Sequence, residues 1–184
     1  MRTGELDAWL PDPAVRTHHR RTARATPGDL WSAASGVRLA DTRTLGRLVR
    51  WRIPGTPADL RFRELFAAYP FVLLAEGDGF SVSGLCGRIW TLTRDYPRLE
   101  DPEAFRAWDR PGTVRVLFAH WVEPDADGRS ALVSEARVRP TDVRAALALR
   151  ALGGLIRTFE RLIATEPLTV ATARAERSGS VARA

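Results

Sequence analysis

Apolar and polar positions alternate along several stretches of the chain, and this alternation predicts β-strands. Residues 113–123 and 130–138 alternate most regularly, and the sequence PDADGR between them predicts the turn of a β-hairpin. Residues 71–77 and 80–92 predict a second hairpin, with its turn at Gly77-Asp78-Gly79. These four strands follow one another closely enough to form one antiparallel sheet.

Apolar residues at helical spacing predict short helices around these hairpins. A polar first strand is expected over residues 16–25, near the edge of the sheet. Thr26 is the expected N-cap of the helix that follows it, with Pro27 at the first helical position. Short helices are predicted over residues 26–36, 42–55, 60–70 and 101–112.

The longest helical pattern lies near the end of the chain. It runs from Thr141, the expected N-cap, to about Thr165. Its apolar stripe consists of Ala148, Leu152, Leu155, Ile156, Phe159, Leu162 and Ile163. Gly153-Gly154 interrupts the pattern, and two glycines cost roughly 2 kcal/mol against alanine inside a helix. We expect them to allow close approach to the sheet, a kink, or room for a ligand.

The order of these elements predicts an α+β fold with the helices packed on one side of the sheet. The chain of 184 residues is most simply one domain. We expect an N-terminal leader over residues 1–15, a single domain over 16–166 and a flexible tail over 167–184.

In the hairpin formed by residues 113–123 and 130–138, the alternation also predicts the strand register and the positions of the polar side chains. Pairing Val122 with Ser130 joins the two mainly apolar faces. A one-residue shift of the register would place Glu135 and Arg137 among apolar side chains, which is energetically costly. The preferred register leaves His120 and Ser134 as diagonal neighbours on the apolar face. They are the candidate polar contacts of a cavity, although a histidine on such a face is more often only a core group.

Glu135 shares the opposite face with Arg115 and Arg137 in this register. We expect these three residues to form a partly solvated cross-strand group of charges with a structural role. The alternative is that Glu135 serves as an acid within the cavity.

Charge and composition argue against several other classes of protein. The net charge is +6, but the arginines are spread along the chain among 22 acidic residues, so no specific nucleic-acid binding is expected. No apolar run reaches the ~20 residues of a transmembrane segment. Glu5 and Asp7 occupy the region where a signal peptide would be basic and then apolar, so we expect a cytoplasmic protein. The single cysteine, Cys86, fits a buried apolar position.

Few residues suggest catalysis. His18 and His19 point to opposite faces of a strand, and His120 is the remaining histidine, so no metal site is expected. There is no glycine-rich phosphate loop and no nucleophile elbow, and no cofactor is expected. Tyr69, Tyr96 and Arg88 are additional candidates for a cyclase-type site, should they line a pocket.

The order of elements resembles the START-like, or Bet v 1-like, helix-grip superfamily. More narrowly, four segments resemble bacterial SRPBCC family proteins of unassigned function, which are polyketide cyclase-like: LGRLVRWRIPG, SGLCGRIWTL, PGTVRVLFAHW and LVSEARVRPTDVRAALALR. The resemblance covers roughly residues 16–166. It implies a curved antiparallel β-sheet wrapped around a long C-terminal helix, with extra short helices after the first strand and an apolar cavity between helix and sheet.

Three functions are compatible with this architecture. The first is binding or carriage of a hydrophobic small molecule, lipid- or polyketide-like, by a monomer or homodimer. The second is a cyclase or dehydratase in which His120 is the acid/base. The third is a protein-interaction module with a filled cavity, whose exposed Trp9, Trp108 or Trp121 would meet a partner. The residues expected to line the cavity are Val116, Phe118, His120, Leu132, Ser134, Leu152, Ile156 and Phe159.

Overall fold

The computed structural model describes residues 3–91, 95–151 and 165–178. Its sheet has five antiparallel strands in the order β1-β5-β4-β3-β2. The strands are β1 (Val15–Ala23), β2 (Val72–Gly77), β3 (Phe80–Gly87), β4 (Val114–Pro124) and β5 (Ser130–Pro140). The polar strand β1 lies at an edge, as its composition predicts.

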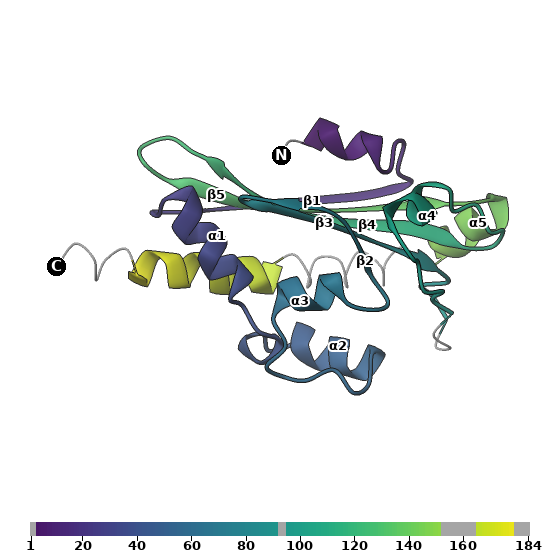
Figure 1. Cartoon of the computed structure of the whole chain (residues 1–184), viewed down its shortest axis with the longest axis horizontal. Helices are drawn as coiled ribbons and strands as arrows, with labels where there is room; N and C mark the ends of the chain where they lie inside the picture. The colour runs from purple at the N-terminus through teal and green to yellow at the C-terminus, as the bar shows by residue number, and fades with distance from the viewer. Residues whose placement is uncertain (1–2, 92–94, 152–164, 179–184) are drawn as a thin grey trace.

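Helices cover one face of this sheet. They include α1 (Pro27–Ser35), α2 (Leu45–Arg52), α3 (Phe62–Ala67) and a C-terminal helix over residues 165–178. Figure 1 shows these helices on one side of the curved sheet and the N-terminal segment on the other. The predicted α+β, helix-grip architecture is therefore confirmed.

The helix α1 and the helix that follows Asp101 begin where the sequence predicts, because local capping determines their starts, whereas α2 and α3 begin three and two residues later than predicted. The side chain of Thr26 accepts a hydrogen bond from the Asp29 N–H at 3.1 Å, and Pro27 opens α1. Asp101 caps α4 (Pro102–Arg106) in the same way, but α4 ends well before Pro111. The remaining elements are α5 (Val143–Ala151) and the 3-10 helices η1 (Thr3–Ala8) and η2 (Leu39–Asp41).

The β4–β5 hairpin differs from the predicted register by two residues. Val122 pairs with Leu132, and Ser130 pairs with Pro124. The prediction that Val122 pairs with Ser130 is therefore wrong. A shift of two keeps every side chain on its predicted face, because the side-chain period of a strand is two. The shift makes His120 and Ser134 direct partners instead of diagonal neighbours.

The sheet is covered on both faces, which the sequence does not predict. The face beneath the helices, here called the inner face, carries buried residues such as Val116, Phe118 and Leu132. The outer face carries Leu117, Trp121 and Val133, which pack in a second buried cluster with Leu6, Leu10, Phe105 and others. The N-terminal segment and α4 supply that cover, so the expected leader contributes two fully buried leucines.

The charges on the outer face are buried, contrary to the expectation of partial solvation. Glu135 is 0% exposed and Arg137 is 1% exposed. Arg137 Nε donates to Glu135 at 2.7 Å, and its other nitrogens donate to Asp7 and to the Leu10 and Thr3 carbonyls. The N-terminal segment excludes water from this pair and is itself held by it.

The cross-strand partners of Glu135 lie on β1, and Arg115 of β4, which the sequence predicts as a partner, is not one of them. Arg16 and His18 both contact its carboxylate, with His18 Nδ1 at 3.1 Å. Burial alone would raise the pKa of Glu135, but hydrogen bonds from Arg137, His18 and Arg16 outweigh it and lower the pKa. Glu135 lies on the face away from the helices, which supports the structural interpretation over that of an acid within the inner cavity.

The end of the chain also departs from the prediction. Asp142, not Thr141, caps α5, because its side chain accepts from the Ala145 N–H at 2.7 Å. Gly153-Gly154 lies outside the described residues. Residues 165–178 are helical, although the sequence predicts the end of a helix near Thr165 and a flexible segment after it. Five residues of that helix are buried: Pro167, Leu168, Ala171, Thr172 and Ala175. The domain boundaries at residues 15 and 166 stay a prediction.

Candidate functional site

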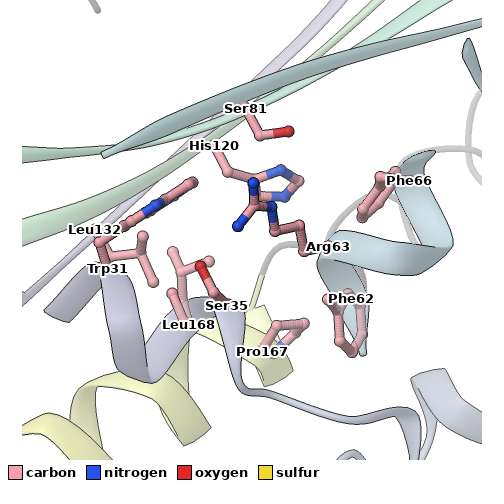
Figure 2. Close-up of a pocket in the computed structure, with 11 residues that line it drawn as sticks. Trp31, Ser35, Phe62, Arg63, Phe66, Ser81, His120, Leu132, Pro167 and Leu168 are labelled. Carbon is pink, nitrogen blue, oxygen red and sulfur yellow. The ribbon is translucent and has the colours of Figure 1, made fainter. Parts of the chain in front are cut away.

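A small cavity lies between the inner face of the sheet and its helices. Its volume is about 50 Å³. The lining comes from α1, α3, β3, β4, β5 and the C-terminal helix: Trp31, Ala34, Ser35, Phe62, Arg63, Phe66, Ser81, His120, Leu132, Pro167 and Leu168 (Figure 2). This space is large enough for about three or four water molecules, and it is far below the roughly 300–1,000 Å³ of a pocket for a drug-sized ligand.

His120 lies at the centre of a polar row that crosses four strands of the inner face. Ser81 of β3 pairs with it on one side and Ser134 of β5 on the other. His19 of β1 pairs with Ser134 and continues the row. Because residues paired directly across an antiparallel sheet share a face, all four side chains belong to the inner face. We call these four residues the inner polar row.

The imidazole of His120 is deep in the protein but faces open space. Part of its ring surface stays accessible because it lines the cavity. The Phe66 ring lies against it, with ring centroids 5.1 Å apart. Among the described residues the structure gives neither ring nitrogen a hydrogen-bond partner. Burial lowers the pKa of His120 from 6.5 to about 4, because an apolar environment disfavours the imidazolium ion. The imidazole is therefore neutral at pH 7, with one nitrogen that donates and one that accepts.

Two serine hydroxyls on this side of the sheet are also buried without a partner in the described structure. Ser35 Oγ lies in the cavity lining, at the end of α1. Ser83 Oγ lies on β3, two residues from Ser81 and therefore on the same face. Since buried hydroxyls are normally satisfied, Ser35 and His120 indicate unfilled hydrogen-bonding capacity in the cavity lining.

Among the described residues that line the cavity, Arg63 is the charged one. Its side chain is 53% exposed and donates to Glu76 at 2.8 Å. An exposed pair of this kind contributes little stability, so Arg63 remains able to exchange Glu76 for another anion.

The structure distributes the expected lining residues into three groups. His120 and Leu132 line the cavity. Val116 and Phe118 lie on the inner face within the packed core, and Ser134 is buried beside His120. Leu152, Ile156 and Phe159 lie outside the described residues, so their contribution stays a prediction.

The other candidates for chemistry lie away from the cavity lining. Tyr69 is 45% exposed and donates to the Tyr96 carbonyl at 3.0 Å. Arg88 is partly exposed beside Asp95. Cys86 is fully buried on the outer side of β3, and burial raises the pKa of its thiol to about 12. Within the described ranges, no group of three or more His, Cys, Asp or Glu residues is arranged to hold a metal ion.

Most of the lining residues come from elements whose place on the sheet the sequence does not reveal. Trp31 and Ala34 lie on the predicted apolar stripe of α1, and Phe62 and Phe66 on that of α3. The helical spacing of these apolar residues in the sequence indicates that they are buried, but it does not indicate that they lie close to His120. Leu168 gave no signal, because it follows a proline in a segment rich in alanine, arginine and threonine.

Comparison with known proteins identifies likenesses in structure alone. No protein-family model and no curated protein sequence matches the chain. A hypothetical protein from Helicobacter pylori has a TM-score of 0.42 and 9% identity, over 92% of this chain and 93% of its own. Norcoclaurine synthase from Thalictrum flavum has a TM-score of 0.33 and 12% identity, over 90% and 86% of the two chains.

An aromatase/cyclase is also among the similar structures. The Zhui aromatase/cyclase from Streptomyces sp. R1128 has a TM-score of 0.33 and 18% identity, over 91% of this chain and 97% of its own. With TM-scores below 0.5, the likenesses identify neither a ligand nor an activity for this chain.

The neutrality of His120 leads to a measurable prediction. In an NMR titration its imidazole should change charge near pH 4 instead of 6.5. Between these values the unfolded chain takes up a proton that the folded chain does not, so the free energy of unfolding falls as the pH falls. Each pKa unit corresponds to about 1.4 kcal/mol. The imidazole resonance that disappears in the His120→Gln variant is the one that belongs to His120. A titration midpoint of that resonance near pH 6.5 would contradict the buried, neutral state.

Proposed function

We propose that this protein binds or carries a small, mainly apolar molecule at the cavity between α1, α3 and the inner face of the sheet. The observation that carries the proposal is the imidazole of His120. It is deep and neutral, faces the cavity and has no hydrogen-bond partner among the described residues.

Energetics favour a guest at this position. A buried donor or acceptor without a partner costs about 1–3 kcal/mol, so His120 and the Ser35 hydroxyl are stabilised by a molecule that bonds to them. Trp31, Phe66 and Leu132 surround the same space and favour an apolar body. A molecule with an apolar frame and one hydroxyl or carbonyl group satisfies both requirements.

The size of the cavity restricts how such a molecule enters. About 50 Å³ is too little for a lipid or a polyketide. Binding of a molecule of that size therefore requires an outward movement of α1 or α3, because the sheet strands on the other side are fixed by their hydrogen bonds. These short helices lie between the first two strands in sequence and can shift without breaking the sheet.

The cyclase or dehydratase alternative depends on the same histidine. A general acid or base works best when its pKa lies near the working pH. A pKa of about 4 makes His120 a weak base at pH 7, and the low value favours hydrogen bonding to a ligand over proton abstraction. Chemical conversion of an extracted ligand by the wild type, with binding but no conversion by His120→Ala, would support the enzyme alternative.

The interaction-module alternative requires that Trp9, Trp108 or Trp121 be exposed, and none of the three forms an exposed surface. Trp121 is 2% exposed, and Trp9 and Trp108 pack against the outer cluster. These tryptophans therefore contribute to the core of the protein and do not form an exposed aromatic patch.

Native mass spectrometry followed by solvent extraction tests the proposal. We expect freshly purified protein to carry an apolar compound, and the Ala34→Phe variant, which fills the cavity, to lose it. Ser32→Phe makes the same change on the exposed side of α1 and should retain the compound. His120→Leu should weaken rebinding of the extracted compound roughly 5–30-fold through the lost hydrogen bond.

The fluorescent probe 1-anilinonaphthalene-8-sulfonate provides a second measurement on the folded variants. Its fluorescence should rise with the wild type and with Ser32→Phe, and much less with Ala34→Phe. Circular dichroism must show the three proteins equally folded. Absence of any extracted compound together with equal probe binding by all three proteins would refute the proposed function.

A further inference from the structure

One exposed surface of the molecule combines a large aromatic side chain with a concentration of positive charge. Residues 42–58 contain four arginines and no acidic residue. This stretch shares that composition with residues 13–28, which also contain four arginines and no acidic residue. It includes α2, which Figure 1 shows at the edge of the helical side, far from the sheet.

The two faces of α2 have opposite characters. Leu45 and Val49 are buried and attach the helix to the inner core. Arg47, Arg50 and Trp51 point the other way and are exposed. Trp51 is 67% exposed, although an indole ring in water is unfavourable unless something covers it. Arg43, just before the helix, is exposed on the same stretch.

Three acidic residues of the described structure flank α2 in the sequence or accept hydrogen bonds at its start. Asp41 forms an ion pair with Arg174 at 2.7 Å. Glu166 accepts hydrogen bonds from the Thr44 and Leu45 N–H groups, at the start of α2 and not on its arginine face. Asp59 begins the next stretch of chain. Arg43 lines a pocket together with Asp41 and Glu166. Among the described residues no ion pair joins Arg47 or Arg50 to an acidic side chain, so these two arginines present exposed positive charge beside Trp51.

We infer that α2 docks the protein onto an anionic lipid surface, with Trp51 at the level of the headgroups and Arg47 and Arg50 on the lipid phosphates. Interfacial helices combine basic residues with aromatic side chains in this way, and Trp is favoured at the boundary between water and hydrocarbon. Among the described residues no helix is long and apolar enough to cross a membrane, so the contact is peripheral. Charge complementarity chooses anionic over neutral lipids.

Vesicle flotation with the full chain tests this inference. The protein should float with vesicles of phosphatidylcholine containing about 30% phosphatidylglycerol, weakly with phosphatidylcholine alone, and less as salt is added. Each arginine near an anionic surface contributes roughly fivefold in affinity, so Arg47→Ala/Arg50→Ala should bind about 25-fold more weakly. Trp51→Ala should lose at least about fivefold, because its ring no longer enters the interface.

Matched variants elsewhere on the surface serve as controls. Arg24→Ala removes one exposed positive charge, and Val143→Ala shortens a side chain that is 75% exposed on α5. Both should bind vesicles like the wild type. Loss of binding in Val143→Ala with none in Trp51→Ala would place the contact on α5 and overturn the inference.

Nucleic acid is the other polyanion to test. A fluorescent double-stranded oligonucleotide is mixed with the wild type and the variants. Nucleic acid would replace the lipid surface as the partner if three results were obtained together: the wild type binds the oligonucleotide but not the vesicles, Arg47→Ala/Arg50→Ala binds it more weakly, and Trp51→Ala binds it like the wild type. No flotation with anionic vesicles at low salt would also refute the inference. Neither outcome affects the proposed function, whose tests concern the cavity.

Discussion

Glu135→Ala is expected to lower the free energy of unfolding by about 3–5 kcal/mol, because it removes the buried carboxylate that pairs with Arg137 and leaves that buried charge paired with Asp7, whose side chain is 62% exposed. Glu135 and Arg137 are fully buried on the outer face, and their side chains lie 2.7 Å apart. Urea denaturation followed by circular dichroism measures the loss.

An exposed carboxylate on the same sheet provides the control. Glu123 pairs with Arg20 at 2.8 Å, but both side chains are more than one-third exposed. Glu123→Ala should therefore cost less than about 1 kcal/mol. Equal effects of Glu123→Ala and Glu135→Ala would show that the outer face is solvated and that the N-terminal segment does not cover it.

A double-mutant cycle isolates the pair. Arg137→Met removes the charge that loses its buried partner in Glu135→Ala, so the double variant should be more stable than the sum of the two single losses predicts. The expected departure from additivity is about 0.5–3 kcal/mol. Additive losses would mean that Arg137 matters only through its bonds to Asp7 and to the carbonyls of the N-terminal segment.

Leu168→Ala is expected to lower the free energy of unfolding by about 2–5 kcal/mol, which is the usual cost of truncating a buried leucine. Leu168 is 3% exposed and packs in the inner cluster, although it lies in the stretch expected to be a flexible tail. Denaturant unfolding gives the value directly.

Glu176→Ala is the control within the same helix. Its side chain is exposed and bonds to the Arg24 N–H, so its removal should cost under about 1 kcal/mol. If Leu168→Ala is as stable as Glu176→Ala, residues 167–178 do not pack on the core, and the flexible tail that the sequence predicts is correct.

The hairpin illustrates how far a local pattern determines structure. Alternation assigned His120 to the inner face and Glu135 to the outer face, and both assignments are confirmed. It did not determine the register, because a shift of two residues leaves every side chain on its face. The direct pairing of His120 with Ser134 depends on the turn geometry and on β1 and β3, which flank the hairpin.

The candidate site shows the same division. His120 and Leu132 were expected in the cavity lining from their strands. Arg63 and Leu168 were not, because helices far apart in the sequence meet there only after the chain has packed on the sheet. The volume of about 50 Å³ likewise depends on how closely α1, α3 and the C-terminal helix approach, which side-chain types alone do not give.

The sequence by itself determined the order of the elements, the starts of α1 and α4, the α+β class and the face on which each β4 and β5 side chain lies. Local capping and side-chain periodicity cause these features, and both act within a few residues. Only the tertiary structure decided that the N-terminal segment buries Glu135 and Arg137 and that residues 165–178 complete the inner core. Those outcomes depend on contacts between segments more than 100 residues apart, such as the bond from Thr3 to Glu135, and no local pattern contains that information.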